Sequence, residues 1–378
     1  MLRGSSTRTW PEQSEPCANT SAPDPNYSLN MERPARPRTS LPFKLGLLGL
    51  SVVTALGVGE ILIRCRGEKP AQTSLGFTVE PANAHLYRRD ESLGYAHVPN
   101  QRISVTLPCD THFTITTTRH GRRATRLAVL DEADALPEIW IFGCSFTLGW
   151  GLNDDQTFPW LLQQGLPEYN VENFGVSGYS TLQSLIQFEE QLAAGRRPAL
   201  VVLAYASFHD ERNTMGPFRR KAVGWAWQNW GEAAQPYATM DATGRIARHR
   251  SESYLPWVPF TKLSALAEFL EWKVVFARER HAARTDHRHE ISQRLVAEFA
   301  QLSRDHGASF VLAEILGGDD MVGYCAQRGI RAGDISAPLG DPGMIIPCDV
   351  HPNAKANQIV AARLEMLLFP LLAPGPHH

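Results

Sequence analysis

Residues 139–159 read IWIFGCSFTLGWGLNDDQTFP and decide the fold class of this chain. The run from Ile139 to Phe142 is apolar at every position, which is typical of a strand buried on both faces of a parallel sheet. The run ends at Gly143, and one hydroxyl, Ser145, follows before a polar loop. Two interpretations stay open on this stretch alone. Ser145 is a catalytic nucleophile at a strand end, or the segment is an ordinary corner between a strand and a loop.

Two further apolar runs, ALVVLAYA at 199–206 and ASFVLAEIL at 308–316, predict more buried strands. Helical patterns lie between and after them, at 180–197, 288–307 and 353–372. The second of these ends at Gly307, a suitable C-cap. Strands that alternate with helices predict an α/β domain at 137–374, with a parallel sheet and helices on both of its faces.

The N-terminal segment 1–42 is rich in Pro, Ser, Arg and Asn and has few large apolar side chains, which predicts disorder. The stretch 45–63 holds 19 residues with one charge, Glu60. At about 1.5 Å per residue such a helix is roughly 28 Å long, close to the thickness of a bilayer core. We predict an uncleaved single-pass membrane anchor at 43–66.

The charges that flank this stretch orient the predicted anchor. Their slight bias places the N-terminus inside, and hence the folded domain on the periplasmic or extracytoplasmic side of a cell inner membrane. A cleaved signal peptide is an alternative, with a long leader of 44 residues unless translation starts at Met31. A buried core helix containing Glu60 is a third interpretation. The basic residues are Arg33, Arg36, Arg38 and Lys44 before the stretch, and Arg64, Arg66 and Lys69 after it.

Two regions surround or interrupt the α/β pattern. Residues 68–136 predict a small β-rich region, because RISVTL and HFTITTT alternate or are β-branched. Residues 214–287 form a Trp-rich insertion with a predicted hairpin at 237–250. The insertion is either a lid or sugar-facing surface, or a packed subdomain whose tryptophans are core. Its tryptophans are Trp225, Trp227, Trp230, Trp257 and Trp272.

Composition excludes several functional classes. The 378 residues are 43% hydrophobic and 20% charged with a net charge of -2, so no basic surface for nucleic acid is expected. The six cysteines form no CxxC pair, which argues against zinc-finger or thioredoxin-like chemistry, and we expect no metal and no cofactor. Cys325 and Cys348 form a disulfide if this region lies outside the cytosol, or else they are two free buried thiols.

Four polar segments follow strand ends or precede helices. In a parallel sheet these ends meet at one edge, and ligands bind at that edge. The segments are GCSFT with Ser145, ENFGVSGYS at 172–180 with Gly175 and Gly178, YASFHDERN at 205–213, and CDVHPNAKAN at 348–357 with Asp349 and His351.

Together these segments supply the parts of a serine nucleophile site. A serine hydroxyl needs a base to remove its proton, and His351 can serve if a carboxylate fixes its tautomer. Asp349 lies two residues before His351, where a loop can bring it beneath the ring. The backbone N–H groups of Ser145 and Gly178 can hold an oxyanion, an effect of roughly 3–4 kcal/mol per donor. Taken alone, a serine after a strand such as Ser145 is more often a cap or turn residue than a nucleophile. An Asp-x-His pattern alone is most often part of a polar surface.

Three of the segments resemble the SGNH, or GDSL-like, hydrolases. FGCSFTLGWGLNDDQTFPWLL is similar to the nucleophile block, NFGVSGYST to the glycine block and DVHPNAKAN to the last block; the likeness covers about 138–213 and 290–370. The resemblance implies a flavodoxin-like three-layer α/β/α fold and hydrolysis or transfer of acyl esters. It implies that Ser145 is the nucleophile, that Asp349 and His351 complete the triad, and that Gly178 donates to the oxyanion.

One block departs from the family. Where the family has an Asn that donates to the oxyanion, this chain has His209. An imidazole N–H can also donate, so we expect His209 to rebuild the site, unless that donor is lost. Asn213 lies nearby at the wrong spacing. Gly is absent two residues after Ser145, which argues against the α/β-hydrolase elbow, and Cys144 is expected to be a packed thiol.

Three functional hypotheses follow. The first is a membrane-anchored SGNH-type esterase that cleaves an O-acyl ester of a small molecule or a surface carbohydrate. The second is an O-acyltransferase that uses the same site with a sugar hydroxyl as the acceptor. The third is a non-catalytic module that binds glycan through the groove and the Trp-rich insertion.

Overall fold

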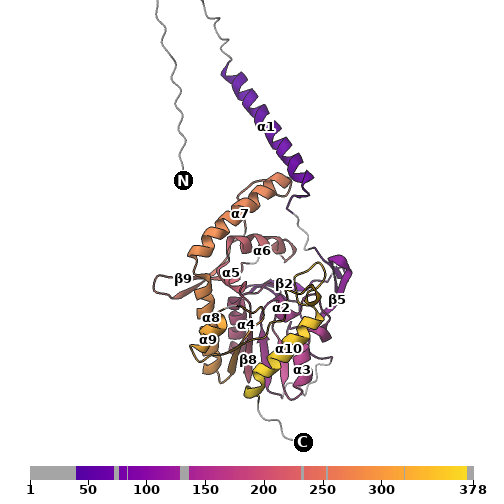
Figure 1. Ribbon diagram of the computed structural model, residues 1–378, viewed down its shortest axis with the longest axis vertical. Helices are drawn as coiled ribbons and strands as arrows, with labels where there is room; N and C mark the ends of the chain where they lie inside the picture. The colour runs from indigo at the N-terminus through magenta and orange to yellow at the C-terminus, as the bar shows by residue number, and fades with distance from the viewer. Residues whose placement is uncertain are drawn as a thin grey trace, which may run out of the picture. The chain divides into compact units, whose positions relative to one another are not determined.

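A five-stranded parallel sheet forms the centre of the chain in the computed structural model shown in Figure 1. Its strands lie in the order β12-β11-β8-β6-β7. Their bounds are β6 (Glu138–Phe142), β7 (Asn170–Asn173), β8 (Leu200–Tyr205), β11 (Ser309–Glu314) and β12 (Arg331–Asp334). The chain passes from β6 to β7 on one side and then crosses to β8 on the other side of β6. Such a reversal opens a crevice at the carboxyl ends of β6 and β8.

The structure describes residues 40–71, 76–82, 84–127, 136–230, 234–252, 254–318 and 320–372, without the side chains of 224–230. The disorder predicted for 1–42 therefore lies outside the described residues, apart from 40–42. Single 3-10 turns are η1 (Pro108–Asp110), η3 (Asp154–Gln156), η4 (Pro342–Met344) and η5 (Phe369–Leu371).

Helices cover both faces of the sheet, and β6 shows why. Successive side chains of a strand point to opposite faces. Ile139 and Ile141 are fully buried in the core beneath α3 and α10, whereas Trp140 and Phe142 are fully buried in the core beneath α4, α8 and α9. The predicted three-layer α/β/α fold is confirmed. The helices are α3 (Phe158–Gly165), α4 (Thr181–Ala193), α8 (Arg288–Asp305), α9 (Met321–Ala326) and α10 (Ala354–Leu368).

A β-rich region precedes the sheet, as predicted. It contains an antiparallel sheet in the order β1-β4-β5 and a β2–β3 hairpin. Its buried side chains share one core with Leu148, Trp150, Val176 and Tyr179, which come from the loops after β6 and β7. The β-rich region therefore packs on the segments that carry Ser145 and Gly178. The strands are β1 (Thr78–Glu80), β2 (Tyr87–Asp90), β3 (Gly94–His97), β4 (Arg102–Leu107) and β5 (Thr111–Thr116).

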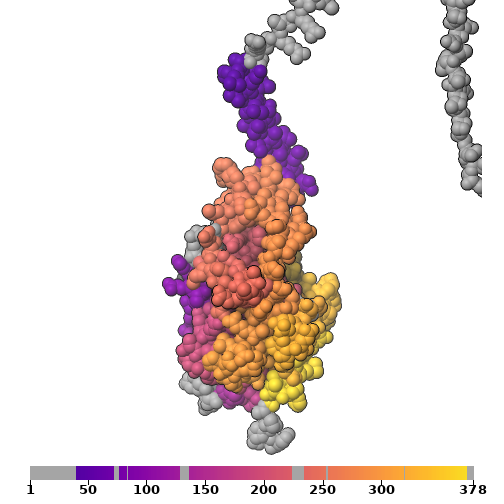
Figure 2. All heavy atoms as spheres, turned by 90° about the vertical axis from the view of Figure 1, so that its left-hand side faces the viewer, coloured from indigo at the N-terminus to yellow at the C-terminus, as the bar shows by residue number. Residues whose placement is uncertain are grey.

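The insertion between β8 and β11 folds into helices and the predicted hairpin. Strands β9 (Pro236–Met240) and β10 (Ile246–Arg250) pair antiparallel. The helices are α5 (His209–Thr214), α6 (Pro217–Trp230) and α7 (Ala265–Thr285), and Figure 2 shows the insertion in salmon and orange on the face turned to the viewer. Trp257 is exposed and Trp272 is half-buried, while the side chains of Trp225, Trp227 and Trp230 lie outside the described residues.

Helix α1 (Leu41–Cys65) covers the predicted anchor and is long and apolar enough to cross a membrane. Its side chains are exposed except for the buried Ile63 and the half-buried Gly59 and Glu60. The chain divides into two units, Met1–Ala55 and Leu56–His378. The last turns of α1 therefore belong to the unit that contains the sheet.

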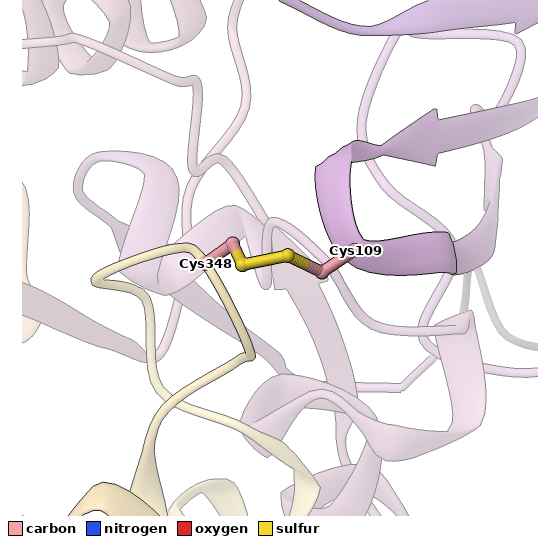
Figure 3. Close-up of a disulfide and its surroundings, with 2 residues drawn as sticks. All are labelled: Cys109 and Cys348. Carbon is pink, nitrogen blue, oxygen red and sulfur yellow. A yellow bond between two sulfur atoms is a disulfide. The ribbon is translucent and has the colours of Figure 1, made fainter.

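The disulfide joins Cys109 to Cys348, so the pair Cys325–Cys348 is wrong, and of the alternative of two free buried thiols only Cys325 is right. Figure 3 shows the bond between the turn after β4 and the loop before α10. Cys325 is a free thiol that is fully buried in the core beneath α8 and α9. It is therefore held in a packed core, whereas Cys348 lies on the loop that precedes α10.

Candidate active site

Ser145 lies at the carboxyl end of β6, as predicted. Gly143 and Cys144 separate it from the strand, and it begins the one-turn helix α2 (Ser145–Leu148). The helix stops at Gly149, whose left-handed φ of 81° ends the turn. Ser145 is 6% exposed, and Cys144 is fully buried in the core beneath α10, which fits the predicted packed thiol.

His351 connects Ser145 to Asp349. Its Nε2 lies 2.8 Å from the Oγ of Ser145, and its Nδ1 faces the Oδ1 of Asp349 in a short hydrogen bond. The same carboxylate oxygen accepts the backbone N–H of His351 at 2.8 Å. An ionised Asp349 can only accept, so Nδ1 carries the proton and Nε2 is free to accept from Ser145. The structure thus brings together three predicted residues that are up to 206 positions apart.

The loop that carries this pair is fixed at several points. The N–H of Ile346 donates to the carbonyl of His351 at 2.9 Å, and Asn353 caps α10 by accepting the N–H of Ala356 at 3.1 Å. The disulfide joins the residue before Asp349 to the β-rich region. These contacts orient the carboxylate and the imidazole before a ligand binds.

The pKa of Asp349 is lowered although the group is half-buried. Burial would raise the pKa, but the hydrogen bond and charge of His351 and the N–H groups of His351 and Val350 outweigh burial. Asp349 is therefore ionised at neutral pH. An ionised carboxylate at this position stabilises a positively charged imidazole.

Two backbone N–H groups next to Ser145 Oγ are available. Within the described residues, the N–H groups of Ser145 and Gly178 donate to no partner. Gly178 has a φ of +79°, and a Cβ there would lie 2.7 Å from the Oη of Tyr95. Gly175 allows a different close approach, because a Cβ there would lie 2.4 Å from the backbone N of Leu148. Both glycines are therefore required by the local backbone.

A pocket of about 290 Å³ opens beside these groups. Its polar lining includes Ser145, His351 and Gly178, and its walls include three aromatic rings from Phe77, Tyr87 and Trp150. Phe77 and Trp150 pack edge to face at 5.0 Å. The lining comprises Phe77, Tyr87, Ser145, Trp150, Ser177, Gly178, Arg212 and His351.

His209 is not in the lining of this pocket among the described residues. It is fully buried at the start of α5, with its Nδ1 3.5 Å from the Oγ1 of Thr181. The rings of Tyr205 and Phe208 lie against it. Burial lowers the pKa of His209 well below its usual value, and the charges of two nearby arginines lower it further. The structure therefore does not bring the predicted His209 together with Ser145.

Asn213 is also engaged away from the pocket. Its Oδ1 accepts the N–H of Leu182 at 2.9 Å, and its Nδ2 donates to the Oγ of Ser292 at 2.8 Å. It is fully buried, so its amide holds α4, α5 and α8 together. Asn213 does not replace the missing family asparagine.

The predicted site residues do not include five residues of the pocket: Phe77, Tyr87, Trp150, Ser177 and Arg212. Phe77, Tyr87 and Trp150 lie on different elements, and nothing in the sequence assigns them to one wall. Arg212 was within reach, because it lies in the segment YASFHDERN that the sequence singles out. No cluster of three His, Cys, Asp or Glu side chains is arranged for a metal ion within the described ranges.

The chain was compared with known proteins. No protein-family model and no curated protein matches it. Similar solved structures include TesA and a member of the lipolytic protein G-D-S-L family from Veillonella parvula. The latter is 12% identical with a TM-score of 0.35, and covers 62% of this chain and 99% of its own. TesA is 18% identical with a TM-score of 0.35, and covers 62% of this chain and 99% of its own.

Two more similar structures are esterases. EstA from Pseudoalteromonas sp. is 12% identical with a TM-score of 0.36, and covers 63% of this chain and 99% of its own. The acetylxylan esterase Axe2 from Geobacillus stearothermophilus is 12% identical with a TM-score of 0.35, and covers 61% and 94%. Since these values are low, the activity of this chain is argued from its own residues.

Proposed function

We propose that the chain is a serine hydrolase of the SGNH type that cleaves an O-acyl ester. The observation that carries the proposal is the continuous hydrogen-bonded series from Ser145 through His351 to Asp349. A nucleophile, a base and a carboxylate in this order are the parts that serine catalysis needs. The open pocket at Ser145 gives an ester access to the hydroxyl.

The proposed reaction has two halves. His351 Nε2 takes the proton of Ser145 as its Oγ attacks the acyl carbon, and the carbonyl oxygen becomes an oxyanion. Collapse breaks the ester bond, and His351 gives the proton to the leaving alcohol. Water, deprotonated by the same nitrogen, then attacks the acyl-enzyme and releases the acid and Ser145.

The free N–H groups of Ser145 and Gly178 are the proposed oxyanion donors. Both lack a protein partner among the described residues, so they can donate without breaking an existing hydrogen bond. His209, expected from the family pattern as a donor, is packed beneath the site and is not needed in this scheme. Its proposed role is structural.

The substrate is proposed to be an acylated small molecule or carbohydrate. Three aromatic rings at the pocket offer flat apolar faces of the kind that stack on sugar rings, next to the nucleophile. The site requires no metal or organic cofactor for this mechanism, because each step uses a protein group or water.

The proposed location is the outer side of a cell inner membrane, with α1 as a single-pass anchor. Two observations support it. Helix α1 has the length and composition of a membrane span. The Cys109–Cys348 disulfide is typical of proteins in oxidising compartments outside the cytosol.

Active-site labelling tests the proposal. A fluorophosphonate probe should label the full-length protein, and Ser145→Ala or His351→Ala should abolish the labelling. Ser309→Ala, which removes an exposed serine hydroxyl on β11 outside the pocket, is the matched control and should keep it. A correctly folded wild type that resists labelling, with glycan binding that survives Ser145→Ala, would support the non-catalytic module instead. Acyl transfer to sugar exceeding hydrolysis in a product assay would support the acyltransferase.

A further inference from the structure

A short loop before α7 exposes four large apolar side chains. Leu255, Trp257, Phe260 and Leu263 are 79%, 41%, 72% and 74% exposed. We call the whole segment from residue 255 to residue 263 the 255–263 loop. Isolated exposed apolar residues are common, but four within nine positions indicate a surface that contacts something other than water.

The 255–263 loop is attached to the last turns of α1. The Glu60 carboxylate accepts the Oγ–H of Ser264 at 2.7 Å and the N–H groups of Ala265 and Leu266 at 3.0 and 2.9 Å. The N–H of Ala71 donates to the carbonyl of Thr261 at 2.8 Å. All of these groups belong to the unit Leu56–His378.

This attachment also accounts for the single charge in the apolar stretch of α1. Arg64 donates to Glu60 at 2.6 Å, so every neighbour that the carboxylate contacts is a hydrogen-bond donor. An unpaired carboxylate at the edge of a bilayer would be costly. Glu60 instead sets the start of α7 against α1.

The position of Glu60 sets the depth of the loop. Glu60 lies three residues before Ile63, the end of the apolar stretch, which is roughly 5 Å along a helix. The groups bonded to Glu60 are therefore close to the level at which an α1 span leaves the lipid. Trp and Phe favour this boundary, and apolar side chains of interfacial segments enter it by about 5–10 Å.

We propose that the 255–263 loop inserts into the surface of the same phospholipid bilayer that α1 spans. The proposal rests on the anchor given under the proposed function. It commits to lipid as the occupant because Glu60 holds the end of the loop beside the last turns of the membrane helix. Lys262 within the loop and Arg66 just after α1 are cations that can contact anionic headgroups.

Site-specific fluorescence in lipid tests this placement. The full chain carrying Cys17→Ser, Cys65→Ser and Phe260→Cys is labelled with an environment-sensitive dye and placed in phosphatidylcholine–phosphatidylglycerol nanodiscs, one copy per disc. A blue-shifted emission is expected, with stronger quenching by nitroxide lipids labelled near the headgroup than by lipids labelled near the bilayer centre. Met366→Cys on α10, 69% exposed, is the matched control and should show neither effect.

The outcomes separate this proposal from the others. A label at Val52→Cys in α1 should be quenched most by the deep nitroxide. If the label at residue 52 is quenched while the label at residue 260 shows neither a blue shift nor quenching, the anchor is supported and the loop proposal is overturned. If neither is quenched, the anchor itself fails. Shielding of residue 260 without lipid quenching indicates a protein contact and also overturns the proposal, while fluorophosphonate labelling of Ser145 reports separately on catalysis.

A second inference concerns Arg212 and stands on different observations. Arg212 is the one cationic side chain in the pocket lining, and no acidic side chain lines the pocket, within the residues that the structure describes. Its guanidinium stacks on Phe208 at 4.2 Å, and its Nη1 donates to the carbonyl of Tyr179 at 3.1 Å. Its Nε and Nη2 donate to no described partner.

We infer that Arg212 binds a carboxylate on the substrate, which deepens the proposed esterase function. The ring of Phe208 and the carbonyl of Tyr179 hold the guanidinium in place. Its Nε and Nη2 can then donate two parallel hydrogen bonds, which is the geometry that carboxylates prefer. The substrate class is thus an acyl ester that carries an acidic group, on either the acyl or the alcohol side.

Paired esters test this inference. Arg212→Gln should raise KM for mono-4-nitrophenyl succinate about tenfold, since a charged hydrogen bond contributes about 1.5 kcal/mol or more, and leave kcat unchanged. The neutral 4-nitrophenyl acetate should keep its kcat/KM within about twofold. An acetylated sugar acid and its methyl ester repeat the comparison with the acid on the alcohol side.

The alternatives give different patterns. Equal losses on acidic and neutral esters, with kcat lowered, would make Arg212 an oxyanion donor or a structural residue and overturn the inference. A KM unaffected by Arg212→Gln for every acidic ester would overturn it as well. Labelling of Ser145 by a neutral fluorophosphonate should survive Arg212→Gln, so failure of the esterase function itself is recognised independently.

Discussion

The corners after β6 and β8 are equivalent by position and differ in use. The two strands are neighbours, and each is followed within four residues by a side chain that the sequence singles out, Ser145 or His209. Ser145 lines the pocket and bonds to His351, whereas His209 is buried under Phe208 and Tyr205. A position after a strand end therefore indicates a candidate site residue. Whether its side chain reaches a ligand depends on the residues that pack around it.

Phe208 accounts for the difference. Its ring packs against Phe146 at 5.6 Å and beneath the guanidinium of Arg212 at 4.2 Å. It occupies the space between His209 and the residue after Ser145. One helical turn further along, Arg212 is the residue of α5 that lines the pocket.

The largest effect is expected on the Ser145 side of the comparison. Asp349→Asn should lower kcat for an aryl ester by roughly 10²–10⁴-fold, because the neutral amide no longer holds the His351 tautomer or stabilises its charged form. The melting temperature should stay within a few degrees. Steady-state kinetics and calorimetry on the same preparation measure both. A variant that unfolds would make Asp349 a structural residue.

Removing the disulfide should have the next largest effect. Cys109→Ala with Cys348→Ala should lower the free energy of unfolding by about 2–4 kcal/mol, because the bond closes a loop of 239 residues. It should also lower kcat, since the loop of Asp349 loses its attachment. Cys325→Ala is the control: it should keep the disulfide, as peptide mapping without reductant can verify. A Cys325–Cys348 peptide in the wild-type protein would contradict the observed pairing.

His209→Leu sharpens the comparison directly. The Nε2 of His209 is buried without a partner in the described part of the chain, so an apolar side chain of similar size should cost little or raise stability by about 1 kcal/mol. Activity toward aryl esters should stay within about threefold. A loss of 10²-fold or more in kcat, with stability kept, would show that His209 serves the oxyanion after all.

A third histidine extends the comparison to pH. Burial lowers the pKa of His97 from 6.5 to about 4, with Arg123 adding to the effect and a hydrogen bond to Gly121 opposing it. The unfolded chain therefore binds this proton at a higher pH than the native protein. The contribution of His97 to stability should fall by up to about 1.4 kcal/mol per pH unit as pH drops from 6.5 to 4, and stay constant below that.

Denaturant titrations across this range measure the slope. His97→Gln should flatten it by the contribution of one proton. An unchanged slope in His97→Gln would mean that His97 is protonated in the native protein.

Patterns local in sequence were predictable, and contacts between distant elements were not. The apolar run at 139–142 predicted a doubly buried strand, and all four side chains are fully buried. The order of Ser145, Asp349 and His351 at strand and helix ends predicted a meeting that the structure contains. Each of these predictions needed only periodicity and the rule that parallel strands end at one edge.

The errors and omissions have one physical origin. The partner of Cys348 is 239 residues away, in the turn between β4 and β5, and no local pattern in the sequence indicates that contact. The pocket walls at Phe77 and Tyr87 come from the β-rich region. There the alternation of apolar and polar residues predicts which face of a strand is buried, but not which loop packs on that face. His209 lies at the sequence position where the family pattern has its asparagine. The ring of Phe208 packs against it, and Arg212 is the residue of α5 that lines the pocket.

The separation of 206 positions between Ser145 and His351 has a consequence for biosynthesis. The hydroxyl leaves the ribosome early, while the imidazole emerges only with the final helix. A nascent or truncated chain therefore carries a serine without its base. By the mechanism proposed above, such a chain could not cleave an ester until the final helix has been synthesised.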